Sequence, residues 1–139
     1  MKHIRKFILE SKSTAETEFE VLKSLHELGL VDDAELNVYT YIASGSTGDL
    51  YLEGTPIAEL PAGLRVGGDL DLRDTQIAEL PADLSVGRDL WLRGTPIAYQ
   101  KIVRWISQLR KELGYVPTEK QIADYIKKMF PGVKGNIII

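Results

Sequence analysis

Leucines spaced two residues apart recur three times in the middle of the chain, each time with a single variable residue between them. The pairs are Leu50 and Leu52, Leu70 and Leu72, and Leu90 and Leu92. Because side chains alternate between the two faces of a strand, each pair predicts a short strand with one buried face. The pairs recur every twenty residues, so the middle of the chain is an internal repeat.

The rest of each repeat follows the same template. Gly48–Gly67 and Gly68–Gly87 are two full copies, and a third copy begins at Arg88 and breaks off at Tyr99. Glycine tolerates a positive φ, and this predicts a corner at Gly67, Gly68 and Gly87. The recurring apolar residues are expected to fill the interior, and they are Ile57, Ile77, Ile97, Leu60, Leu80, Leu64, Leu84, Val66 and Val86. The two valines also predict a second short strand on the opposite side, and stacked copies predict a parallel β-solenoid of about 2.5 repeats.

This pattern resembles the short bacterial leucine-rich repeat. Residues 70–81, Leu-Asp-Leu-Arg-Asp-Thr-Gln-Ile-Ala-Glu-Leu-Pro, align with the leucine spacing and the leucine-proline ending of that family. The chain departs from the family at Thr55, Thr75 and Thr95, where asparagine is usual. A threonine hydroxyl still donates a hydrogen bond, although it satisfies fewer backbone groups than an asparagine amide. The resemblance covers residues 48–97 and implies a leucine-rich-repeat solenoid.

Amphipathic segments on both sides of the repeat predict helical hairpins that cap its two ends. Before the repeat, helices are expected over residues 14–28 and from Asp32 or Asp33 to about Ile42. Thr14 and Gly29 are the expected caps of the first helix. Its apolar stripe is Phe19, Leu22, Leu25, His26 and Leu28.

After the repeat, a helix is expected over residues 98–113 and ends at Gly114. A capping box at Thr118–Gln121 predicts a second helix that runs to about Phe130. The final Ile137, Ile138 and Ile139 predict either a packed edge strand or a tail that docks a partner. The fold class is therefore α/β, with a basic tail (1–13), an N-terminal helical cap (14–44), the solenoid (45–97) and a C-terminal helical cap with an apolar tail (98–139).

Composition narrows the class of protein. The 139 residues include no cysteine and only two histidines, His3 and His26. This composition excludes disulfides, thiolate catalysis and cysteine-bearing zinc sites, and it leaves little for a Ser-His-Asp triad. We therefore expect no enzyme activity, no cofactor and no metal. No apolar run approaches the length of a membrane span, and the absence of cysteine fits a reducing compartment, so we expect a protein of the cytoplasm.

The net charge of -3 conceals blocks of opposite sign, and residues 98–139 carry a balance of +5. Within that block, residues 109–123 resemble the Gly-Tyr-x-Pro-Thr-x-x-x-Ile segment of LexA-type repressors, in which the helix that follows reads bases. Here the chain runs into Pro131-Gly132 with no length left for that helix. Nucleic-acid binding is thus an alternative to protein binding. The residues that would bind phosphates are Lys101, Arg104, Arg110, Lys111, Lys127 and Lys128.

The first eleven residues form a short basic amphipathic stretch that resembles the capsid-targeting leaders of internal head proteins in tailed bacteriophages. Those leaders end at a maturation-protease site of the form Leu/Ile-x-Glu, which Ile8-Leu9-Glu10 matches. The resemblance implies cleavage after Glu10 and packaging as cargo, so the expected location is the cytoplasm of a bacterial host or a phage particle. The alternatives are a frayed extension or a first helical turn that packs on the cap.

Candidate binding residues lie at positions that the core does not need. Tyr51, Asp71 and Trp91 each stand between two leucines and are expected to point outward. Tyrosine, tryptophan and arginine often dominate the energy of protein interfaces. The predicted partner-binding residues are Tyr51, Glu53, Asp71, Arg73, Trp91 and Arg93. Trp91 is either exposed for a partner or covered by the C-terminal helices.

The aspartates at positions 49, 69 and 89 form a further column beside these residues. Such acids usually accept hydrogen bonds from the neighbouring backbone, and the alternative is a calcium ion that relieves their mutual repulsion. Taken together, the sequence predicts a non-enzymatic protein-interaction module that presents a rigid strand face. A nucleic-acid-associated regulator and a purely structural virion component are the alternatives.

Overall fold

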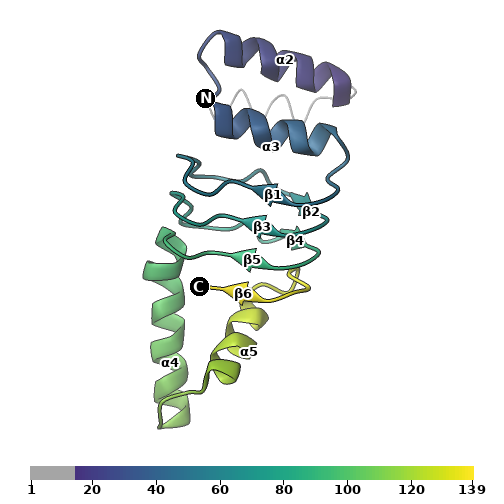
Figure 1. Cartoon of the computed structure of the whole chain (residues 1–139). Helices are drawn as coiled ribbons and strands as arrows, with labels where there is room; N and C mark the ends of the chain where they lie inside the picture. Colours follow the sequence, from purple (N-terminus) through teal and green to yellow (C-terminus); the bar gives the residue numbers. More distant parts are fainter. Residues whose placement is uncertain (1–14) are drawn as a thin grey trace. The chain divides into compact units, whose positions relative to one another are not determined.

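The computed structural model describes residues 15–139 (Figure 1). The chain forms two compact units that divide between Ser46 and Thr47. Among residues 15–139, the first unit contains helices α2 and α3, and the second contains α4, α5, a π-helical turn and the six strands. The fold is mixed α/β, as the sequence predicts, and its strands belong to two parallel sheets.

The first unit is a pair of packed helices, α2 (Ala15–Glu27) and α3 (Asp33–Ala43). Gly29 ends α2 with a φ of +75°, and the side chain of Asp32 caps α3 by accepting the backbone N–H of Glu35. Both boundaries confirm the prediction, although the proposed cap Thr14 lies outside the described residues. Three buried residues form the core of the unit, and they are Leu22, Val31 and Tyr39.

One residue of the predicted apolar stripe is misplaced. Leu28 follows the end of α2 and is 73% exposed, because it lies four residues after Ser24 and seven after Val21, on the exposed side of the helix. Leu25 packs against the core as expected. Nothing is described for the side chain of Phe19.

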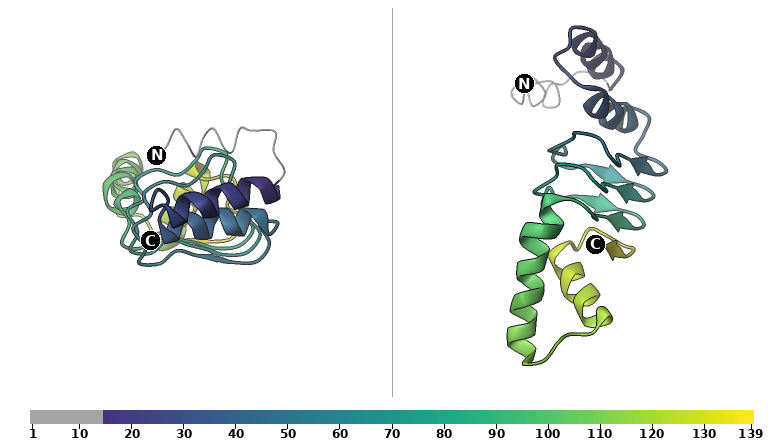
Figure 2. Two further views of the ribbon diagram at one scale, coloured as in Figure 1. Left: turned by 90° about the horizontal axis from the view of Figure 1, so that it is seen from above. Right: turned by 60° about the vertical axis from the view of Figure 1, so that its left-hand side comes forward.

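The second unit is built from stacked turns of chain, which we call rungs (Figures 1 and 2). Rung 1 is Gly48–Gly67, rung 2 is Gly68–Gly87 and rung 3 begins at Arg88. One parallel sheet has the order β1-β3-β5-β6, and its strands are Leu50–Tyr51, Leu70–Asp71, Leu90–Trp91 and Ile137–Ile138. The second sheet pairs β2 (Arg65–Val66) with β4 (Ser85–Val86), which confirms the predicted second strand.

The register of both sheets follows the twenty-residue period. Leu50 pairs with Leu70 and Leu70 with Leu90, so equivalent residues of successive rungs lie side by side. The leucines that flank each variable position are buried, as the alternation predicts. The interior of the rungs consists mainly of Leu50, Leu52, Ile57, Leu64, Val66, Leu70, Leu72, Ile77, Leu84, Val86, Leu90, Leu92 and Ile97.

The corner glycines are required for a reason other than the one expected. Gly68 and Gly87 do not have a positive φ. Instead, a Cβ atom at Gly87 would collide with the carbonyl oxygen of Gly67, and one at Gly68 would lie 2.9 Å from the carbonyl carbon of Gly48. These glycines therefore permit two rungs to approach closely, and the explanation from positive φ is wrong for them.

The positive φ values lie after the strands instead. Gly54, Asp74 and Gly94 occupy equivalent positions in the three rungs and have φ values of 71°, 57° and 77°. The next residue in each rung is a threonine, whose hydroxyl donates to the carbonyl oxygen of the leucine three residues earlier at 2.6–2.8 Å. Threonine therefore fixes this turn within its own rung.

The third rung is interrupted by a helical hairpin. A π-helical turn, η1 (Ala98–Ile102), leads into α4 (Val103–Leu113), and α5 (Glu119–Met129) follows. Gly114 ends α4 in the left-handed conformation, and Thr118 and Gln121 form the predicted capping box. The two helices contact each other, and the rings of Trp105 and Phe130 lie 5.8 Å apart.

After the hairpin the chain returns to the rungs. Val133 bridges in parallel to Val86, and β6 then pairs with β5 as an edge strand (Figure 1). This arrangement confirms the edge-strand alternative for Ile137 and Ile138. Residues 98–132 thus replace the short segment that joins the two strands in rungs 1 and 2.

No helix in the described part of the chain has the length and apolar character needed to cross a membrane.

Candidate functional site

The central column of the candidate site runs across the four-stranded sheet. In register, Tyr51 of β1 pairs with Asp71 of β3, Asp71 with Trp91 of β5, and Trp91 with Ile138 of β6. Tyr51 is 64% exposed, whereas Trp91 and Ile138 are half-buried. Asp71 is only 3% exposed, so the expectation that it is an exposed contact residue is wrong.

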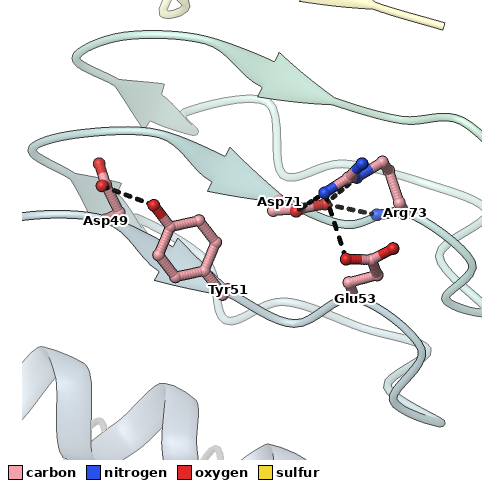
Figure 3. A network of polar contacts seen from close by, with 5 residues as sticks. All are labelled: Asp49, Tyr51, Glu53, Asp71 and Arg73. Atoms are coloured by element: carbon pink, nitrogen blue, oxygen red, sulfur yellow. Dashed lines mark hydrogen bonds and ion pairs between the residues drawn. The ribbon is translucent and has the colours of Figure 1, made fainter.

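Asp71 is buried because Arg73 folds back over it (Figure 3). The guanidinium donates from Nε to Oδ1 at 2.9 Å and from Nη2 to Oδ2 at 2.6 Å, and the backbone N–H of Arg73 donates to Oδ1 at 3.1 Å. Nη2 also donates to Glu53 of the preceding rung at 3.2 Å. Two carboxylates from adjacent rungs therefore hold one guanidinium group.

The charges of this cluster are mutually stabilised. Burial alone would raise the pKa of Asp71, but the hydrogen bonds and the positive charge of Arg73 outweigh burial and lower it. The hydrogen bond to Asp71 in turn raises the pKa of Arg73. Both groups are charged at neutral pH, and Arg73 keeps a fixed position on the face.

Arg73 also contacts Trp91 of the next rung. Its Cζ atom lies 5.2 Å from the centroid of a Trp91 ring, within the range of a cation–π interaction. The C-terminal segment reaches Trp91 through β6, where Ile138 is its register partner. Trp91 is thus neither fully exposed nor fully covered, and part of its ring remains accessible on the face.

The aspartate column links each rung to the next. The Oδ1 atoms of Asp49, Asp69 and Asp89 accept the backbone N–H groups of Asp69, Asp89 and Asn136 at 2.7, 2.9 and 2.8 Å. This geometry confirms the role as backbone acceptors. Among residues 15–139, no group of three or more His, Cys, Asp or Glu side chains is arranged to hold a metal ion.

Tyr51 is anchored to the same column. Its hydroxyl donates to Oδ2 of Asp49 at 2.8 Å (Figure 3). The pKa of Asp49 is lowered by the backbone N–H of Asp69 and then by this hydroxyl, and donation to Asp49 raises the pKa of Tyr51. The tyrosine ring is therefore exposed but held at its outer end.

Arg93 occupies the position in rung 3 that Arg73 occupies in rung 2. Its side chain is exposed, and no residue of the described range forms a hydrogen bond or an ion pair with it. Of the six predicted contact residues, the structure therefore presents Tyr51, Glu53, Arg73, Trp91 and Arg93 at the surface and places Asp71 beneath them.

The basic residues of the C-terminal helices are spread over the hairpin. Lys101 pairs with Glu79 of rung 2 at 3.0 Å. The others are exposed, and they are Arg104, Arg110, Lys111, Lys127 and Lys128. The residues after α5 form β6 and join the sheet, so the described chain has no third helix in the place of a base-reading element.

The proposed processing residues Ile8 and Glu10 lie outside the described residues. Sequence reasoning also missed that Val133 completes the third rung and that a fourth begins at Gly135, although residues 135–139, Gly-Asn-Ile-Ile-Ile, repeat the Gly-Asp-Leu-x-Leu pattern of residues 68–72 with similar residue types.

Comparisons with protein-family models, curated proteins and solved structures found no match to the chain. The face consists of an exposed tyrosine, a half-buried tryptophan, an arginine held by two carboxylates and an arginine with no ion pair in the described range.

Proposed function

We propose that the chain is a non-enzymatic protein-interaction module built on a short solenoid of the leucine-rich-repeat type. Tyr51, Arg73, Trp91 and Arg93 are its contact residues, and Glu53 completes the rim. Asp71 acts beneath the face by holding Arg73 in place. The parallel stacking of twenty-residue rungs with buried leucines supports the assignment to this type of solenoid.

The observation that carries the proposal is the clamping of Arg73 by Asp71 and Glu53 beside Trp91. Immobilising a side chain on association costs about 0.5–1.5 kcal/mol, and a side chain that is already fixed avoids much of this cost. Tyrosine, tryptophan and arginine are also the residue types most enriched among energetically dominant interface positions. The face is therefore pre-organised for binding another protein.

The proposal is tested by capture of partners from the native host with purified protein. Tyr51→Ala and Arg93→Glu alter exposed side chains of the face, and each is expected to reduce capture by roughly tenfold or more. Arg65→Glu is the matched control, because Arg65 is exposed on β2 of the other sheet and has no ion pair among the described residues.

Arg93→Glu and Arg65→Glu should unfold at nearly the same temperature as the wild type, because exposed substitutions away from special contacts change stability little. Tyr51→Ala also removes the exposed hydrogen bond to Asp49, so its unfolding temperature is measured beside its capture and should fall only slightly. Equal loss of capture in Arg65→Glu, or unchanged capture in both face variants, would show that binding does not use this face.

The cellular setting is part of the proposal. The absence of cysteine and the leader-like Ile8-Leu9-Glu10 favour a bacterial cytoplasm or a phage particle. Mass spectrometry of purified particles should then find the chain cleaved after Glu10. Particles that lack the chain would remove the virion-associated setting and leave the binding face to be tested on its own.

A further inference from the structure

We infer, on the basis of the proposed function, that the partner is a protein segment with a carboxylate that pairs with Arg93 and an aromatic or aliphatic side chain that packs on Trp91 and Ile138. Two equivalent arginines of the repeat differ in their ion pairs. Arg73 and Arg93 lie in adjacent rungs, twenty residues apart, and only one of them has acidic partners.

The repeat itself explains why Arg93 is unpaired. Arg73 follows Asp71 by two residues and lies next to Glu53 of the preceding rung. Arg93 follows Trp91 by two residues, and the preceding rung presents Arg73 at the equivalent position. Neither of these two positions holds a carboxylate. Asp74 of the preceding rung donates its backbone N–H to the carbonyl oxygen of Arg93 at 2.9 Å, but within residues 15–139 no side chain forms a hydrogen bond or an ion pair with the Arg93 guanidinium.

A carboxylate supplied by a partner could pair with Arg93 in the way that Asp71 pairs with Arg73 in rung 2. Arginine pairs with carboxylates through two parallel hydrogen bonds, as Arg73 does with Asp71 through Nε and Nη2. The guanidinium of Arg73 is already neutralised by two acids, so Arg93 is the free positive charge of this face. An acidic group on the partner is the charge that complements it.

The position of the apolar contact follows from the same rung. Trp91 precedes Arg93 by two residues and has Ile138 as its register partner, and both are half-buried. Two residues of an extended chain span about 6.6 Å. The partner should therefore carry its acid roughly one pleat away from its apolar side chain, as Glu-x-Leu or Asp-x-Trp does in an extended segment.

The charges elsewhere on the face favour a protein over a nucleic acid. Asp49, Asp69 and Asp89 form a row of carboxylates on the other side of the central column, and Glu53 lies at its rim. A polyanion that reached Arg93 would meet these acids along the rest of its length. A single carboxylate on a mostly apolar segment avoids them.

The test is a selection from a library of random twelve-residue peptides displayed on a carrier, with the full wild-type chain immobilised. Enriched peptides are expected to carry Asp or Glu two positions from Trp, Phe, Leu or Ile. A synthetic peptide with the enriched sequence, labelled with a fluorophore, then gives dissociation constants by fluorescence polarisation. Arg93→Glu should weaken binding roughly tenfold or more, and Arg65→Glu should leave it unchanged.

The decisive measurement is a charge exchange. The same peptide with its acid replaced by lysine should bind Arg93→Glu better than it binds the wild type. Trp91→Ala should also abolish binding, and Tyr51→Ala serves as the second face variant should Trp91→Ala fail to fold. A labelled twenty-residue oligothymidine tested alongside should not bind in an Arg93-dependent manner.

The outcomes separate this inference from the proposed function. Peptides that need Tyr51 or Trp91 but carry no acid and ignore Arg93→Glu would overturn the inference and leave the protein-binding face intact. Peptides that ignore every face variant would overturn both. Arg93-dependent binding of the oligothymidine would replace the protein segment with a nucleic acid.

Discussion

The close approach of successive rungs predicts that Gly87→Ala severely destabilises the second unit. The added Cβ would collide with the carbonyl oxygen of Gly67 and lie 2.9 Å from its carbonyl carbon. Both obstacles are backbone atoms, and no rotation of a side chain relieves them. Rungs 1 and 2 must therefore separate at this corner.

The loss of unfolding free energy can be calculated from the hydrogen bonds that are broken when rungs 1 and 2 separate. Gly87 N–H donates to Val66 at 2.7 Å and Arg88 N–H donates to Gly68 at 3.1 Å. Two such hydrogen bonds contribute about 1 kcal/mol each, and overpacking adds about 1–3 kcal/mol of strain. The expected loss is about 3–5 kcal/mol, a large part of the ~5–15 kcal/mol that stabilises a typical domain.

Urea unfolding followed by tryptophan fluorescence measures this loss. Both tryptophans, Trp91 and Trp105, lie in the second unit, so the signal reports that unit. The control is Arg88→Ala, at the next residue, which is exposed and has no ion pair in the described chain. It should cost less than about 0.5 kcal/mol. A Gly87→Ala protein within about 1 kcal/mol of the wild type would refute the argument from close approach.

Two further predictions concern the acids of the face. Because the folded pKa of Asp71 is below its unfolded value, its charge stabilises the fold above about pH 4 and this contribution is lost as the pH falls through the folded pKa. Asp71→Asn should therefore flatten the decline of the unfolding free energy as the pH falls below about 4, measured by urea unfolding, and an unchanged slope would contradict the assignment. Asp69→Ala removes the acceptor for the N–H of Asp89 and should cost about 1 kcal/mol, whereas Asp69→Asn keeps an acceptor oxygen and should cost clearly less. Equal unfolding midpoints for the two Asp69 variants would show that the hydrogen bond contributes nothing.

The sequence was sufficient to predict the rungs and the helix boundaries, because both depend on local patterns. Leucines at a strict twenty-residue spacing determine the register, and the residues at Gly29, Asp32, Gly114 and Thr118 are strong helix-terminating or helix-capping types. Both the leucine spacing and the helix caps can be recognised within a short stretch of sequence, without knowing which distant residues come into contact.

The burial of Asp71 could not be predicted from the alternation of side chains between the two faces of a strand. Its position between two leucines directs it away from the core, and the long Arg73 side chain folds back and hydrogen-bonds to it there. Whether Arg73 folds back or extends depends on Glu53 and Trp91, which come from two other rungs. The candidate site was therefore predicted in its membership but not in the role of its central acid.

The final rung was missed for a different reason. The helical hairpin displaces residues 133–139 from the twenty-residue period, and Asn136 and isoleucines stand in place of aspartate and leucines. A search for a fixed period does not find a repeat that resumes after an insertion. The role of Gly68 and Gly87 was also mispredicted. A glycine in the sequence does not by itself show whether the position needs a positive φ or a close approach of another backbone segment.

The detour of the chain through the hairpin has a consequence for the order of folding. Successive rungs are joined through loops of twenty residues, whereas the hydrogen bond from Asn136 to Asp89 closes a loop of 47 residues. The longer closure costs about 0.8 kcal/mol more in chain entropy. We therefore expect the last strand to dock after the earlier rungs have formed.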